Sequence, residues 1–275
     1  MYIYIRSPYT EKYTRYAFVH HKNPYINYDS WRILNIYVCD SDLNALYTNL
    51  PGECECEGAL RERLDNGSVA SDFIGGYHGD ETLIDITVLV DGEELDMTRD
   101  HPLTECDCIQ ATVKSYLFRV DSDEKVFERT KTDTFTDKGV EIKNRYDTLA
   151  KISIERAATS LLGICLSENG FEGLIKEHWD NVSNKWIEIS DFDTHKNMCN
   201  ATGFVEAKMR GALSVHLKTY DCKINGENTS PYGHFSYQAY KPKRVKIYVD
   251  PFQNRTLEVG DVFESTSLQS IFAAE

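Results

Sequence analysis

Apolar and polar residues alternate over many short segments of this chain, which is the period of two expected of half-buried β-strands. In residues 139–146, Val140 and Ile142 alternate with Glu141 and Lys143, and the turn Thr136-Asp137-Lys138-Gly139 joins this segment to residues 127–136 as a predicted hairpin. The same pattern, or a high content of β-branched and aromatic residues, predicts further strands at 33–39, 84–90, 109–120, 152–155, 186–189, 204–209, 213–220, 245–249 and 256–262.

Helical signals are fewer. Residues 57–64 fit two helical turns before Asn66-Gly67, residues 157–162 fit either a short helix or a buried strand, and residues 265–274 fit a C-terminal turn. We therefore predict an all-β fold, a large two-sheet antiparallel β-sandwich with one or two short helices. No repeat or linker divides the sequence, so residues 1–275 are predicted to form a single β-sandwich domain, either by itself or within a larger protein.

Composition narrows the range of partners. The chain contains 17 Tyr, 12 Phe and 3 Trp, which suits both β-structure and surfaces that recognise sugars or peptides. With 44 acidic and 30 basic residues the formal net charge is −14, which argues against nucleic acid, because phosphate contacts need clustered Lys and Arg. No apolar run approaches the roughly 20 residues of a membrane-spanning helix.

Eight cysteines include two Cys-x-Cys pairs, Cys54/Cys56 and Cys106/Cys108, and none has the spacing of a structural zinc site. We interpret them as reduced, inward-facing thiols, with disulfides or metal ligation as alternatives. No P-loop, Rossmann fingerprint or nucleophile elbow is present, which argues against the kinase, dehydrogenase and hydrolase classes that carry those signatures. We predict no cofactor and assign no metal ligands, with a Ca²⁺ site assembled from separate loops as the alternative in so acidic a chain. The N-terminus lacks a signal-peptide pattern; reduced cysteines favour the cytoplasm, and the localisation stays open.

The sequence Gly75-Gly76-Tyr77-His78-Gly79-Asp80-Glu81 combines titratable side chains with three glycines directly before a predicted strand. In an extended backbone, His78 and Asp80 share one face while Tyr77 and Glu81 share the other. Such a pair suits acid/base chemistry or contacts to sugar hydroxyls. A glycine-rich loop whose side chains bond their own backbone fits the same residues.

Three further groups of residues are candidates for ligand contacts. His216, Lys218 and Tyr220 point to the same side of one predicted strand, where they either recognise an acidic sugar on a concave sheet or simply face water. Trp179 and Trp186 bracket a polar turn, and two interpretations fit them: they are exposed platforms on which a pyranose ring stacks, or they are core residues. The segment 232–237 repeats the aromatic-glycine-histidine order with Tyr232 and His234.

The hairpin formed by residues 127–135 and 139–146 resembles the hairpin that leads into the concave face of the galactose-mutarotase-like carbohydrate-active proteins. This resemblance covers about a fifth of the chain and implies a supersandwich with a sugar-facing concave sheet. That family commonly uses a His as acid and a Glu as base, but neither role aligns with a residue of this chain. The resemblance therefore does not imply aldose epimerase activity.

Three functions follow as hypotheses. The leading one is a carbohydrate-binding protein with the 75–81 loop at the rim of a concave sheet and contacts from Tyr77, Trp179, Lys218, Tyr232 and His234. The second is an epimerase or polysaccharide lyase, in which His78 or His216 is the acid/base, Tyr220 a second proton-transfer group, and Asp80 or Glu81 the orienting carboxylate. The third is a structural module of a larger assembly, such as a phage or cell-surface fibre, which a concentration-dependent oligomer with no glycan response would support.

Overall fold

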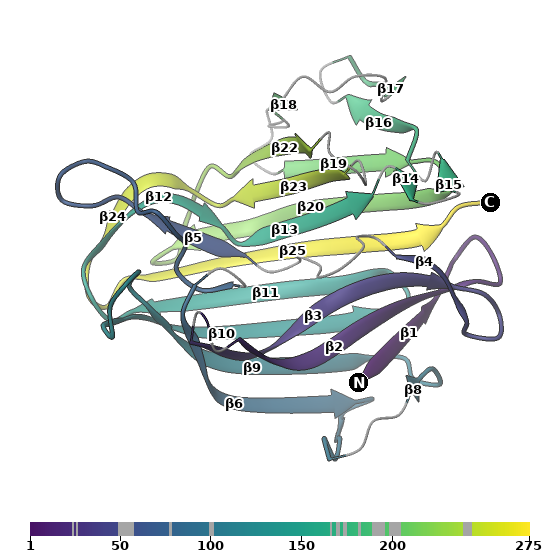
Figure 1. Ribbon diagram of the computed structural model, residues 1–275, viewed down its shortest axis with the longest axis horizontal. Helices are drawn as coiled ribbons and strands as arrows, with labels where there is room; N and C mark the ends of the chain where they lie inside the picture. The colour runs from purple at the N-terminus through teal and green to yellow at the C-terminus, as the bar shows by residue number, and fades with distance from the viewer. Residues whose placement is uncertain are drawn as a thin grey trace.

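The computed structural model describes residues 1–23, 25, 27–48, 58–76, 79–98, 102–165, 167–168, 171–172, 175–180, 183–188, 196–197, 205–238 and 244–275. Within these residues the largest sheet has sixteen strands (Figure 1). Its main path runs β17 (Lys185–Glu188), β16 (Glu177–Asp180), β19 (Val205–Arg210), β20 (Leu213–Ile224), β25 (Val262–Ala273), β11 (Gly139–Thr148), β10 (Lys125–Thr136), β9 (Ile109–Phe118), β6 (Glu81–Val90), β3 (Tyr28–Cys39), β2 (Tyr13–Asn23), β1 (Tyr2–Arg6) and β8 (Pro102–Leu103).

Shorter strands and smaller sheets complete the described architecture. The large sheet also includes β4 (Ala45–Thr48), β7 (Glu93–Glu94) and β21 (Glu227–Asn228), which lie off its main path. One smaller sheet has the order β24 (Gln253–Leu257), β12 (Ile152–Ala158) and β5 (Ala59–Glu62). A second has the order β13 (Ser160–Cys165), β23 (Arg244–Asp250), β22 (Tyr232–Gln238) and β18 (Lys196–Asn197), and β14 (Ser167–Glu168) pairs with β15 (Phe171–Glu172).

The large sheet folds over onto itself at the junction of β3 and β6. These two strands are parallel and pair only through Tyr28 with Glu81 and Asp29 with Thr82. Beyond this junction β1, β2 and β3 lie against β9, β10 and β11 (Figure 1), where the ring of Phe18 packs 6.3 Å from that of Phe135. The result is the predicted sandwich, built largely from one continuous sheet, and its apolar core lies between the two layers.

The predicted hairpin at residues 127–146 is confirmed, with β10 and β11 paired from Phe127↔Thr148 to Thr136↔Gly139. Gly139 has a φ of 115°, and a Cβ atom there would lie 2.3 Å from the backbone oxygen of Gln269. Only glycine fits this position, because both the backbone angle and the close neighbouring strand exclude a side chain. The turn therefore fixes the register of the hairpin at the centre of the sheet.

The predicted helices are wrong within the described residues, where the regular elements are strands. Residues 59–62 of the supposed 57–64 helix form β5, because their backbone pairs with β12 and buries Leu60 and Glu62. Residues 157–162 follow the alternative of a buried strand, and residues 265–274 fall mostly within β25. In all three cases pairing with distant strands outweighs a short local helical pattern. No described helix is long and apolar enough to cross a membrane.

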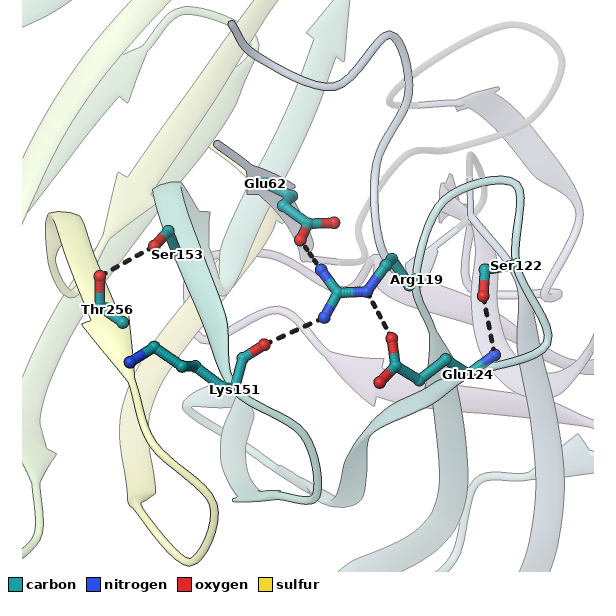
Figure 2. Close-up of polar contacts among 7 residues, drawn as sticks. All are labelled: Glu62, Arg119, Ser122, Glu124, Lys151, Ser153 and Thr256. Atoms are coloured by element: carbon teal, nitrogen blue, oxygen red, sulfur yellow. Dashed lines mark hydrogen bonds and ion pairs between the residues drawn. The ribbon is translucent and has the colours of Figure 1, made fainter. Parts of the chain in front are cut away.

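Arg119 joins the small sheet containing β5 to the large sheet (Figure 2). This residue follows β9, and its guanidinium pairs with Glu62 of β5, donates to Glu124 at 2.6 Å and donates to the backbone oxygen of Lys151 at 3.0 Å. Glu62 is buried, with 3% of its side chain exposed. The contacts of one cation therefore hold three separate segments together around a buried carboxylate.

Candidate functional site

The two faces of β20 differ in chemistry, as the alternation of its sequence predicts. Leu213, Val215 and Leu217 are buried in the core, whereas His216, Lys218 and Tyr220 lie on the opposite, outer face of the sheet. The side chains of His216, Lys218 and Tyr220 are therefore partly exposed on the face of the sheet that points away from the core. Strands β16, β17, β19 and β11 extend this face with the side chains that we call the outer strip: Glu141, Lys143, Trp179, Trp186, Glu206, Lys208, Arg210, His216, Lys218 and Tyr220.

His216 forms the centre of the strip with a carboxylate from the neighbouring strand. Its Nε2 lies 2.8 Å from Oε1 of Glu206, and Nζ of Lys208 lies 3.3 Å from the same oxygen. Burial is the main influence on the imidazole and lowers the pKa of His216, although Glu206 acts in the opposite direction. Burial opposes ionisation of Glu206, but hydrogen bonds from His216 and Lys208 outweigh it and lower the pKa of the carboxyl. At neutral pH the pair is a neutral imidazole donating to a carboxylate.

Tyr220 makes a second pair of the same kind further along β20. Its hydroxyl donates to Glu141 of β11, which also pairs with Lys143 at 2.9 Å. The phenol crosses β25 to do so, since Tyr220 is aligned with Thr266 and Thr266 with Lys143. Burial, followed by the neighbouring Glu141, raises the pKa of Tyr220 to about 12. The hydrogen bond from Tyr220 is the largest influence that lowers the pKa of Glu141.

Two tryptophans lie at the other end of the strip. The rings of Trp179 and Trp186 are cross-strand neighbours in an edge-to-face arrangement, 5.5 Å apart at 72°. The guanidinium of Arg210 lies 4.2 Å above the Trp186 ring and donates to Glu177 at 2.6 Å. Both indoles are partly exposed rather than core residues. This arrangement offers an apolar surface bordered by charged hydrogen-bonding groups.

The 75–81 loop lies elsewhere. Tyr220 is in register with Thr87 of β6 through β25, β11, β10 and β9, so Glu81 is five strands away and six residues further along. Glu81 is buried: its Oε1 lies 2.5 Å from Nη2 of Arg129, and its Oε2 accepts from the backbone nitrogen of Gly76 at 3.4 Å. This carboxylate holds the glycine turn from the inside.

The remaining candidates fall into separate places. Asp80 is partly exposed, and burial followed by Asp121, Asp123 and Asp72 raises its pKa. Tyr77 and His78 lie outside the described residues. Tyr232 and the backbone of His234 belong to β22 in a different sheet, paired with Asp250 and Tyr248, and the His234 side chain is outside the described part. Among the described residues, no three His, Cys, Asp or Glu side chains gather as a metal site.

Sequence reasoning missed Glu206, Glu141 and Arg210. Each contributes to the strip only through strand pairing: Glu206 is ten residues from His216 in the chain, and Glu141 is 79 residues from Tyr220. Their positions on the polar sides of predicted strands were the only signal available.

By sequence, the chain matches no protein-family model and no curated protein. Solved structures with a similar fold include the galactosidase domain of the α-galactosidase–sucrose kinase AgaSK, at 11% identity and a TM-score of 0.50, covering 97% of this chain and 41% of that one. A GH36 α-galactosidase from Geobacillus stearothermophilus, solved with stachyose, has 10% identity and a TM-score of 0.51, covering 99% and 41%. A galactose mutarotase-like protein from Clostridium acetobutylicum has 8% identity and a TM-score of 0.43, covering 95% of each chain.

The predicted resemblance is thus confirmed at the level of fold, because the chain shares its β architecture with the two galactosidase structures. It spans about two fifths of the length of the two galactosidases. At such low identity the similarity concerns the fold and not the residues of a site.

Proposed function

We propose that this protein binds carbohydrate on the outer strip. The observation that carries the proposal is the continuity of the Trp179–Trp186 pair with the His216–Glu206 and Tyr220–Glu141 pairs on one face of adjacent strands. Aromatic rings stack on the apolar faces of pyranoses, while planar polar groups exchange hydrogen bonds with ring hydroxyls. An extended strip of this composition suits an oligosaccharide lying along the sheet.

The protonation states favour binding over proton transfer. A phenol whose pKa is about 12 remains a hydrogen-bond donor at neutral pH and is a poor base. His216 and Tyr220 are four residues apart on one strand, about 13 Å at the usual rise, too far to act on a single carbon. The alternative of an epimerase or lyase using this pair is therefore the weaker one.

The fold similarity supports sugar as the ligand class, since one of the similar galactosidases was solved with stachyose. As a second and separate part of the proposal, the 75–81 turn contacts the sugar at the rim of the sheet, away from the outer strip. In this arrangement Glu81 acts by holding the turn, and Asp80 is the carboxylate available at its surface.

A glycan panel that reads binding and product formation together tests the proposal. The variants are Trp179→Ala and His216→Ala. The matched control is His20→Ala, because His20 on β2 is a similarly exposed histidine that also pairs with a carboxylate, that of Asp29, at 2.5 Å. We expect binding without turnover, and at least about tenfold weaker affinity for the two strip variants but not for the control. Equal affinity of all variants, silence on every glycan, or product release abolished by His216→Ala would contradict it.

A further inference from the structure

The inner face of β10 carries charges in an unusual place. Arg129, Lys131 and Asp133 alternate along this strand between Phe127 and Phe135, and all five side chains are buried. Only 3% of the Lys131 side chain and none of the Asp133 side chain is exposed, and Nζ lies 3.1 Å from Oδ2. Taking an ion pair out of water usually stabilises a fold less than apolar side chains of the same size would. A buried lysine and aspartate in this position therefore suggest a chemical role.

An asparagine completes the group. Lys131 is the direct cross-strand partner of Asn144 on β11, and both side chains face the interior. Lys131, Asp133 and Asn144 line one narrow pocket, together with Ile33, Gly58, Ile142 and Thr159. Directly opposed residues have Cβ atoms about 5 Å apart, so a lysine amine reaches the asparagine amide by rotation of its own side chain.

The amide of Asn144 is also held in place. Its Nδ2 donates to the backbone oxygen of Thr159 at 3.3 Å, which fixes the plane of the amide within the pocket. In a low-dielectric interior, transfer of a proton from the ammonium to the carboxylate removes two charges and leaves an amine beside a carboxylic acid. A neutral amine is a nucleophile, and a neighbouring acid both polarises an amide and donates a proton to its leaving group.

We propose that Lys131 and Asn144 form an intramolecular isopeptide bond, with Asp133 as the proton-transfer group. Nζ of Lys131 bonds to Cγ of Asn144, the Cγ–Nδ2 bond breaks, and Nδ2 leaves as ammonia. The Asp133 acid donates its proton to Nδ2, and the resulting carboxylate accepts the proton that Nζ loses, so the reaction needs no oxidant or cofactor. The product is a covalent link between β10 and β11 inside the sandwich. It is independent of carbohydrate binding on the outer strip, which lies on the other face of the same hairpin.

The natural protein provides the first test, since the reaction removes one ammonia and lowers the intact mass by about 17 Da. High-resolution mass spectrometry of the purified, folded chain is expected to show this loss, and a proteolytic digest to show one branched peptide joining the segments of Lys131 and Asn144. A folded protein with the full sequence mass, or a branched peptide at other residues, would overturn the proposal.

Variants then test the role of each group. Lys131→Arg, Asn144→Ala and Asp133→Asn are each expected to restore the full mass expected for the variant sequence. Lys143→Arg is the control, because it changes the lysine on the outer face of the same hairpin, and it is expected to retain the loss. Retention of the loss in Lys131→Arg or Asn144→Ala would assign the link elsewhere and overturn the proposal, and its retention in Asp133→Asn would remove Asp133 from it.

Discussion

Lys131 and Lys143 lie on opposite faces of one hairpin, and each pairs with a carboxylate two residues away on its own strand. Lys131 contacts Asp133 at 3.1 Å in the interior, whereas Lys143 contacts Glu141 at 2.9 Å with 59% of its side chain exposed. The two pairs have similar geometry and opposite solvation. They provide an internal comparison of what burial does to a charge pair.

We expect Lys131→Met to destabilise the protein by at least about 3 kcal/mol, because it removes both the partner of the buried Asp133 side chain and the proposed link to Asn144. Lys143→Met is expected to cost less than about 1 kcal/mol, as for other exposed pairs. Urea denaturation of both variants beside the natural protein measures the difference. Equal losses of unfolding free energy in the two variants would contradict the difference in burial between Lys131 and Lys143.

Asp250 is expected to make stability depend on pH. Burial raises its pKa to about 6 from 3.8, against the opposing influence of Arg156, whose Nε lies 3.6 Å away. The folded state therefore binds a proton that the unfolded state releases, so this stabilisation is present below about pH 4 and is lost as the pH rises through 6. Asp250→Asn removes the ionisation.

Urea unfolding at pH 4, 5, 6 and 7 measures this effect as the difference between the natural protein and Asp250→Asn. The variant is expected to gain relative stability as the pH increases over that range, by up to about 3 kcal/mol. A difference that stays constant across the range would show that Asp250 keeps an ordinary pKa.

Removal of the Arg119 guanidinium is expected to weaken the attachment of the small sheet to the large one. Arg119→Ala leaves the carboxylate of Glu62 buried without its cation, at a cost of about 2–4 kcal/mol. Lys151→Ala is the control, because Arg119 contacts only the backbone oxygen of Lys151, and the Lys151 side chain forms an exposed pair with Glu258. Chemical denaturation is expected to show a change within about 1 kcal/mol for the control.

Two glycines in hairpin turns allow the cost of backbone strain to be measured separately from the cost of steric crowding. Gly92 has a φ of 90° and open space where a Cβ atom would lie, whereas Gly139 has both a positive φ and a neighbouring backbone oxygen 2.3 Å from that position. Gly92→Ala is expected to cost roughly 1 kcal/mol from strain alone. Gly139→Ala is expected to cost clearly more, and thermal unfolding of the two variants tests the order.

The sequence predicts the faces of strands well and their partners poorly. The period of two correctly places Leu213, Val215 and Leu217 inside and His216, Lys218 and Tyr220 outside, because burial acts on each strand separately. The Tyr220–Glu141 pair depends on the order of β20, β25 and β11, which local patterns do not encode. The same limit explains the wrong helix at residues 57–64, where pairing of β5 with β12 decides the conformation.

The position of β25 has a consequence for how the protein reaches its fold. This strand lies between β20 and β11 in space but follows both in the chain, so each presents an open edge until β25 arrives. The contact from the Ser7 hydroxyl to the backbone oxygen of Ala273 spans 266 residues, which illustrates how much of the sandwich depends on distant contacts. Such long-range pairing makes folding slow and exposes strand edges to neighbouring molecules during synthesis. We therefore expect the chain to be most prone to aggregation in the interval before residues 262–273 enter the gap between β20 and β11.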